Sequence, residues 1–132
     1  MAIAFVQFAN SAPGIFQLNT SGLAAAQVLA GGNYLPVYQV GAAGSIVPLP
    51  IDLSQGQVYL ILYGTGIRNA QNVTVTVGGQ SVPSAFAAQG FYAGEDQVNV
   101  GPLPASLAGK GSVSIVVTAD GLAANTVNVT FR

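Results

Sequence analysis

The sequence predicts an all-β protein, folded as two stacked antiparallel sheets with little or no helix. Three observations lead to this expectation. Apolar and polar residues alternate with a period of two in several segments, turn-forming residues separate those segments, and only residues 21–30 have a helix-forming composition over any length. Many short alternating strands without long helices are typical of sandwiches and barrels.

The amino-terminal segment, residues 2–9, is apolar on both faces and is expected to form a strand. No Lys, Arg, Asp or Glu occurs between Met1 and Asp52, so no charge protects this strand against pairing with another chain. We expect residues 1–10 to join the domain's own sheet; the alternative is strand donation to a neighbouring subunit. The candidate contact residues of this segment are Ile3, Phe5 and Phe8.

The next segments carry weaker signals. Residues 21–30 contain Gly22 and end at two glycines, so a short strand over residues 25–29 is as good a prediction as a helix. Pro48 and Pro50 indicate an edge strand or a strand that changes sheets, because proline cannot donate a ladder hydrogen bond.

Residues 57–63 are apolar on both faces, which predicts a strand at the centre of a sheet with a cover over each side. Tyr59 and Tyr63 fall on the same side of this strand. We expect both tyrosines to pack against the second sheet as part of the core.

Three further segments, residues 72–77, 112–118 and 126–131, alternate Val, Ile or Phe with Thr, Ser or Asn. Their apolar residues are expected to face inward and their polar residues outward. Gly78-Gly79 follows the first segment and Asp120-Gly121 joins the other two. Both dipeptides predict tight hairpins, because these turns need positive φ angles.

The composition bounds the function. A chain of 132 residues is expected to form a single domain over residues 1–132. It contains no His and no Cys, which removes the commonest metal ligands, the usual general base and the thiol nucleophile. Three basic against four acidic residues offer no cluster for a phosphate backbone, and no apolar run is long enough to predict a transmembrane helix. We therefore predict no catalytic, cofactor or metal site and no nucleic-acid partner.

The few charged and aromatic residues are the remaining candidates. Glu95 and Asp96 are adjacent on an extended segment and point to opposite faces, so they are expected to be solvated charges at the start of a strand. Tyrosines beside amide side chains are typical of carbohydrate-binding surfaces. The candidate tyrosines for a partner contact are Tyr34, Tyr38 and Tyr92.

Four motifs, taken in chain order, resemble a known family: residues 11–16 (SAPGIF), 60–67 (LILYGTGI), 73–79 (VTVTVGG) and above all 92–100 (YAGEDQVNV). The order is similar to that of the Solibacter uncharacterised C-terminal domain, which is found at the end of large secreted bacterial proteins. From residue 57 to 132 it also resembles the IPT/TIG branch of immunoglobulin-like domains. The resemblance implies an immunoglobulin-like antiparallel β-sandwich and carries over no catalytic residue.

These expectations together predict a non-catalytic structural or adhesive module of a secreted or cell-surface bacterial protein, acting as a stalk, cap or interaction unit. Its expected partners are other protein domains or further copies of itself. One alternative is a carbohydrate-binding module, with polysaccharide as the partner. A further alternative is a filament subunit that assembles by strand donation.

Overall fold

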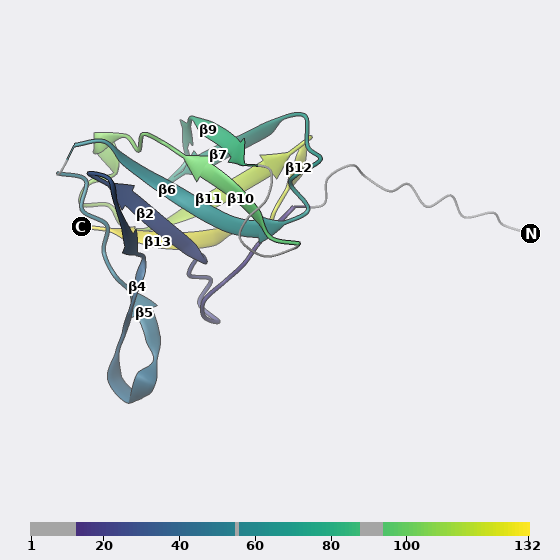
Figure 1. The fold of residues 1–132 in the computed structure, drawn as a ribbon. Helices are drawn as coiled ribbons and strands as arrows, with labels where there is room; N and C mark the ends of the chain where they lie inside the picture. Colours follow the sequence, from purple (N-terminus) through teal and green to yellow (C-terminus); the bar gives the residue numbers. More distant parts are fainter. Residues whose placement is uncertain (1–12, 55, 88–93) are drawn as a thin grey trace, which may run out of the picture.

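The computed structural model describes residues 13–54, 56–87 and 94–132, which form two antiparallel sheets packed face to face (Figure 1). Helical structure in these residues is confined to two short 3₁₀ turns, η1 (Ala42–Gly44) and η2 (Ala105–Leu107). The prediction of an all-β sandwich with little or no helix is confirmed. Within the described ranges, no helical segment is long and apolar enough to cross a bilayer.

Sheet 1 lies toward the viewer in Figure 1, with β6 at its centre. Its strand order is β3 (Asn33–Pro36), β2 (Ala26–Ala30), β6 (Val58–Thr65), β10 (Asp96–Val100) and β9 (Ser84–Ala87). A short strand, β1 (Gly14–Ile15), continues the β2 edge and pairs with the end of β6. Close approach there requires a glycine, because a Cβ on Gly64 would collide with the Gly14 carbonyl oxygen.

Sheet 2 lies behind, in the order β12 (Leu122–Ala123), β11 (Gly111–Ala119), β7 (Val73–Val77) and β8 (Gln80–Val82). The last strand, β13 (Val127–Phe131), pairs with the first half of β11. A separate two-stranded hairpin, β4 (Tyr38–Val40) and β5 (Ile46–Pro48), projects from the body and is called the arm (Figure 1).

Both predicted hairpins are present. Gly78 and Gly79 have φ angles of 59° and 80° and join β7 to β8, while Asp120 and Gly121, at 49° and 83°, join β11 to β12. The second hairpin differs from the prediction in the strand that follows its turn. Only the two-residue strand β12 follows the turn directly and pairs with the end of β11. The predicted strand follows later as β13 and pairs with the first half of β11.

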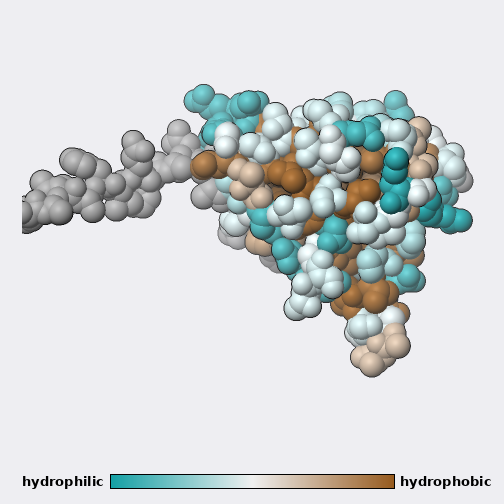
Figure 2. Space-filling model, turned by 180° about the vertical axis from the view of Figure 1, so that it is seen from behind, coloured by the Kyte–Doolittle hydropathy of each residue, from teal (hydrophilic) through white to brown (hydrophobic). Residues whose placement is uncertain are grey.

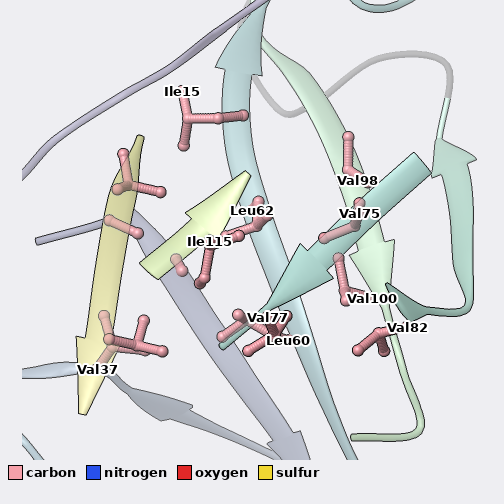
Figure 3. Packing of buried hydrophobic residues seen from close by; sticks show 14 of the residues in the cluster. Ile15, Val37, Leu60, Leu62, Val75, Val77, Val82, Val98, Val100 and Ile115 are labelled. Carbon is pink, nitrogen blue, oxygen red and sulfur yellow. The ribbon is translucent and has the colours of Figure 1, made fainter. Parts of the chain in front are cut away.

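The core lies between the two sheets, where Val75 and Val77 of β7 face β6 and β10 (Figure 3). The inward set predicted for the three alternating segments is buried in this cluster, with Val73 and Val113 partly buried at its margin. The remaining buried members of that set are Ile115, Val117, Val127, Val129 and Phe131.

The expectation for the two tyrosines of β6 is wrong. Val58, Leu60 and Leu62 fill the core at 1%, 0% and 0% exposure, and strand alternation therefore turns Tyr59 and Tyr63 to the outer face. Both alternate sets of β6 are apolar, so the period of two could not tell which one faces inward. Aliphatic side chains fill the gap of about 10 Å between sheets without a polar atom, whereas a tyrosine hydroxyl needs a partner or water.

The short strand predicted over residues 25–29 and the edge or sheet-changing segment predicted from Pro48 and Pro50 are both confirmed. β2 starts one residue later than predicted and ends one residue later, and Pro48 lies in the two-stranded arm. Beyond the arm the chain crosses to sheet 2, where Ile51 forms a parallel bridge with Phe131 of β13.

Candidate binding face

The outer face of sheet 1 gathers aromatic and amide side chains from strands far apart in the sequence. The strand register aligns Tyr34 of β3, Leu29 of β2 and Tyr59 of β6 in one row. The next row contains Gln27, Ile61 and Asn99, from β2, β6 and β10. None of the labelled strands covers this face in Figure 1, where sheet 1 lies toward the viewer.

A hollow of about 330 Å³ lies on this face. Tyrosine and aliphatic side chains form one part of its lining and amide side chains the other. The lining residues are Leu29, Tyr34, Tyr59, Ile61, Gln97 and Asn99. None of these described residues carries a charge, so the hollow suits an uncharged ligand.

Hydrogen bonds hold the polar groups around this hollow. The Gln97 Nε2 amide donates to Asn99 Oδ1 at 3.0 Å, and the Tyr63 hydroxyl donates to Gln27 Oε1 at 2.8 Å. Burial raises the pKa of the Tyr63 hydroxyl, and the nearby carboxylate of Glu95 raises it further. The hydroxyl therefore keeps its proton and remains a donor at neutral pH.

The predicted contact residues are placed as follows. Tyr34 is 62% exposed and lines the hollow, whereas Tyr38 is 40% exposed and lies on the arm, outside the lining. The remaining candidates, Ile3, Phe5, Phe8 and Tyr92, lie outside the described residues. The structure thus joins Tyr34 to a set that the sequence reasoning missed. The missed members are Leu29, Tyr59, Ile61, Gln97 and Asn99.

A signal for this set was present in the sequence. The alternate positions 58, 60 and 62 are all aliphatic, which would assign them to the core and leave the tyrosines outside. The following segment, residues 96–100, alternates valine with amides, which would place Gln97 and Asn99 on an outer face. That these outer faces belong to neighbouring strands follows only from the pairing of β6 with β10.

A second hollow, of about 220 Å³, lies on the inner side of β3, where Val28, Leu35, Leu49 and Ile51 contribute to an apolar lining. The arm begins beside it. The base of the arm is held by a hydrogen bond from Leu49 N to Val37 O at 2.9 Å. Val40, which is 66% exposed, contributes to the apolar surface of the arm. Figure 2 shows the arm from behind, standing out from the body with apolar surface on its sides.

The expectation for Asp96 as a solvated charge is wrong, because its side chain is 1% exposed. Oδ2 accepts hydrogen bonds from the backbone N–H groups of Ile67 and Arg68 at 2.8 and 3.0 Å, and Oδ1 accepts one from Arg68 Nε at 2.7 Å. These bonds fasten the loop after β6 to the start of β10. Within the described ranges no three His, Cys, Asp or Glu side chains cluster as a metal ion would require.

Comparisons of the chain with protein-family models, with curated proteins and with solved structures found no match.

Proposed function

We propose that the chain is a non-catalytic, immunoglobulin-like module of a secreted or cell-surface bacterial protein, and that it acts as a load-bearing stalk and interaction unit. The resemblance of residues 11–132 to the Solibacter C-terminal and IPT/TIG domains supports this origin. The non-catalytic part of the proposal is supported by the lack of His and Cys, which are the usual general base and thiol nucleophile, and by the use of buried Asp96 as a structural tie.

The strand order supports the immunoglobulin-like part of the proposal. When β2, β6, β7, β9, β10, β11 and β13 are lettered A to G in chain order, sheet 1 contains A-B-E-D and sheet 2 contains G-F-C. This is the arrangement of an immunoglobulin constant-type sandwich. The present chain adds β3 outside the first strand, the arm after it, and β8 beside β7 at the edge of sheet 2.

The observation that carries the load-bearing role is the parallel pairing of an early segment with the last strand. Leu23 forms a parallel bridge with Asn128; Ala24 N donates to Asn128 O at 3.0 Å, and Asn128 N donates to Gly22 O at 2.9 Å. The Asn128 side chain adds a bond from Nδ2 to Ser21 O at 2.8 Å.

A second contact extends this pairing toward the carboxyl end. Ile51 N donates to Thr130 O at 2.8 Å, and Arg132 N donates to Ile51 O at 3.0 Å. The free edge of β13 is therefore held by two separate segments, residues 22–24 and Ile51. We call these contacts the edge clamp.

Tension between the two ends would load the edge clamp in shear. Figure 1 shows the purple start of the described chain and the C-terminus at opposite ends of the sandwich. Two parallel strands pulled from their opposite ends slide along each other, so their hydrogen bonds must break together. Bonds that break one after another resist far less force.

Single-molecule force spectroscopy tests this role through the choice of pulling points, because a chain without native cysteine allows defined cysteine handles. Handles at Pro13 and Arg132 load the edge clamp in shear. Handles at Lys110 and Arg132 unzip β13 from β11, since Gly111 and Phe131 are paired neighbours. We expect a several-fold higher unfolding force for the first pair, because forced unfolding follows the unfolding barrier. Equal forces for both pairs would contradict a load-bearing role.

A further inference from the structure

We propose that the outer face of sheet 1 binds an uncharged, β-1,4-linked polysaccharide, with Tyr34 and Tyr59 as stacking platforms. This inference deepens the interaction role proposed above by naming the ligand class and the face. It rests on the distribution of the tyrosines, the spacing of the two platforms, the chemistry of the neighbouring amides and the size of the face.

The tyrosines are concentrated on this face. The sequence contains five tyrosines, and three of them, Tyr34, Tyr59 and Tyr63, lie on the outer face of sheet 1. The outer positions of β7 in sheet 2 are threonines. Solubility alone would not place tyrosines on one face and hydroxyl side chains on the other, so the difference points to a ligand for sheet 1.

The two platforms have a spacing that suits an extended sugar chain. Tyr34 and Tyr59 both lie opposite Leu29, on either side of β2. They are therefore two strand spacings apart, about 10 Å between backbones. An extended β-1,4-linked chain repeats the orientation of its sugar rings over a comparable length, so alternate rings can stack on the two tyrosines.

Amide side chains supply the polar contacts that sugar hydroxyls need. Gln97 and Asn99 line the same hollow as the tyrosines and are already oriented by their mutual hydrogen bond of 3.0 Å. Each amide offers both a donor and an acceptor, which matches a hydroxyl group that also donates and accepts. The absence of charge in the described lining favours a neutral sugar over an anionic one.

The size of the face favours a polysaccharide over a folded protein partner. The hollow is lined from four strands, β3, β2, β6 and β10. At about 4.8 Å between strands and about five residues along each, this part of the sheet covers roughly 300 Å². A stable protein interface needs about 800 Å² of accessible surface on each partner. The face is smaller than this and is hollowed between its tyrosines and amides, which suits a narrow chain better than a folded domain.

The binding test uses the intact protein and neutral hexasaccharides of β-1,4-linked glucose, xylose and mannose. Tyrosine emission reports binding directly, because the chain contains no tryptophan, and calorimetry provides the affinity. We expect saturable binding of at least one of the three. Tyr34→Ala and Tyr59→Ala should each weaken it about tenfold or more, which is about 1.4 kcal/mol.

Matched variants separate stacking from other effects. Tyr38→Ala removes an exposed tyrosine from the arm, outside the hollow, and should leave the affinity within about twofold. Tyr34→Phe keeps the ring and should retain most of the affinity. Asn99→Ala should weaken binding without changing either platform. Tyr34 lies on the exposed edge strand β3, so its variants are expected to fold like the wild type, which a thermal melt verifies.

Three results would overturn the proposal. They are no saturable binding to any neutral hexasaccharide, tighter binding to polygalacturonate than to the neutral chains, and an equal loss in Tyr38→Ala and Tyr34→Ala. None of these results changes the unfolding force measured between Pro13 and Arg132. Failure of the binding face is thus distinguishable from failure of the load-bearing role.

Discussion

Replacing Asp96 with asparagine is expected to destabilise the protein by about 3 kcal/mol at pH 7. The carboxylate is 1% exposed and accepts three hydrogen bonds, two from backbone N–H groups and one from Arg68 Nε. The asparagine amide has one acceptor oxygen instead of two and turns an NH₂ group toward donors. It also leaves Arg68, whose side chain is 35% exposed, without its counter-ion. The larger cost comes from the buried backbone N–H of Ile67 and the buried side chain at position 96, because a buried polar group without a partner costs its full desolvation energy.

Urea denaturation with far-UV circular dichroism measures the effect. Asp52→Asn is the matched control, since it makes the same change at a carboxylate that accepts a hydrogen bond from the exposed backbone N–H of Ser54. The control should change the free energy of unfolding by less than about 0.5 kcal/mol. A loss in Asp96→Asn no larger than in the control would show that the buried carboxylate does not hold the loop.

The same carboxyl predicts a pH dependence of stability. Burial, the largest influence, raises the pKa of Asp96, but hydrogen bonds from Ile67 N, the Arg68 side chain and Arg68 N, and the Arg68 charge, together hold it below its usual value. A lowered pKa in the folded state means that the stabilisation is fully present above the unfolded value of about 3.9. It is lost as the pH falls through the folded pKa. The difference between wild type and Asp96→Asn should therefore be constant near neutral pH and shrink below about pH 4.

Leu60→Ala is expected to cost about 3 kcal/mol, within the range of about 2–5 kcal/mol seen for buried leucines. Leu60 is fully buried and belongs to the same core cluster as Val77 of the opposite sheet (Figure 3). Truncation removes apolar contact between the two sheets and leaves a cavity that the rigid strands cannot close.

The matched control for this variant is Leu122→Ala, on β12, where the leucine is 46% exposed. It should cost well under 1 kcal/mol, because nearly half of the side chain is already in water and the rest lies at the surface. The midpoints of urea unfolding compare the two variants. Similar costs at both positions would mean that the aliphatic set of β6 does not face the core.

Local rules predicted the strands and hairpins from the sequence. Alternation in residues 72–77, 112–118 and 126–131 assigned the inward residues, since the side chains of an extended chain alternate whatever their partners are. Gly78-Gly79 and Asp120-Gly121 predicted their turns because a positive φ is a property of the residue itself.

Contacts between distant strands decided the features that local rules could not predict. Alternation did not decide which face of β6 points inward, because both of its faces are apolar. The all-aliphatic set at 58, 60 and 62 is the one that the structure buries, so Tyr59 lies on the outer face and not in the expected core. The partner of Asp96 is Arg68, 28 residues earlier, and the partner of Asn128 is Ser21, 107 residues earlier. The sequence by itself determined which residues alternate and where the chain turns, because these depend on neighbours along the backbone. Only the tertiary structure decided which face is wet, which charge is buried and which strands meet, because these depend on contacts between distant segments.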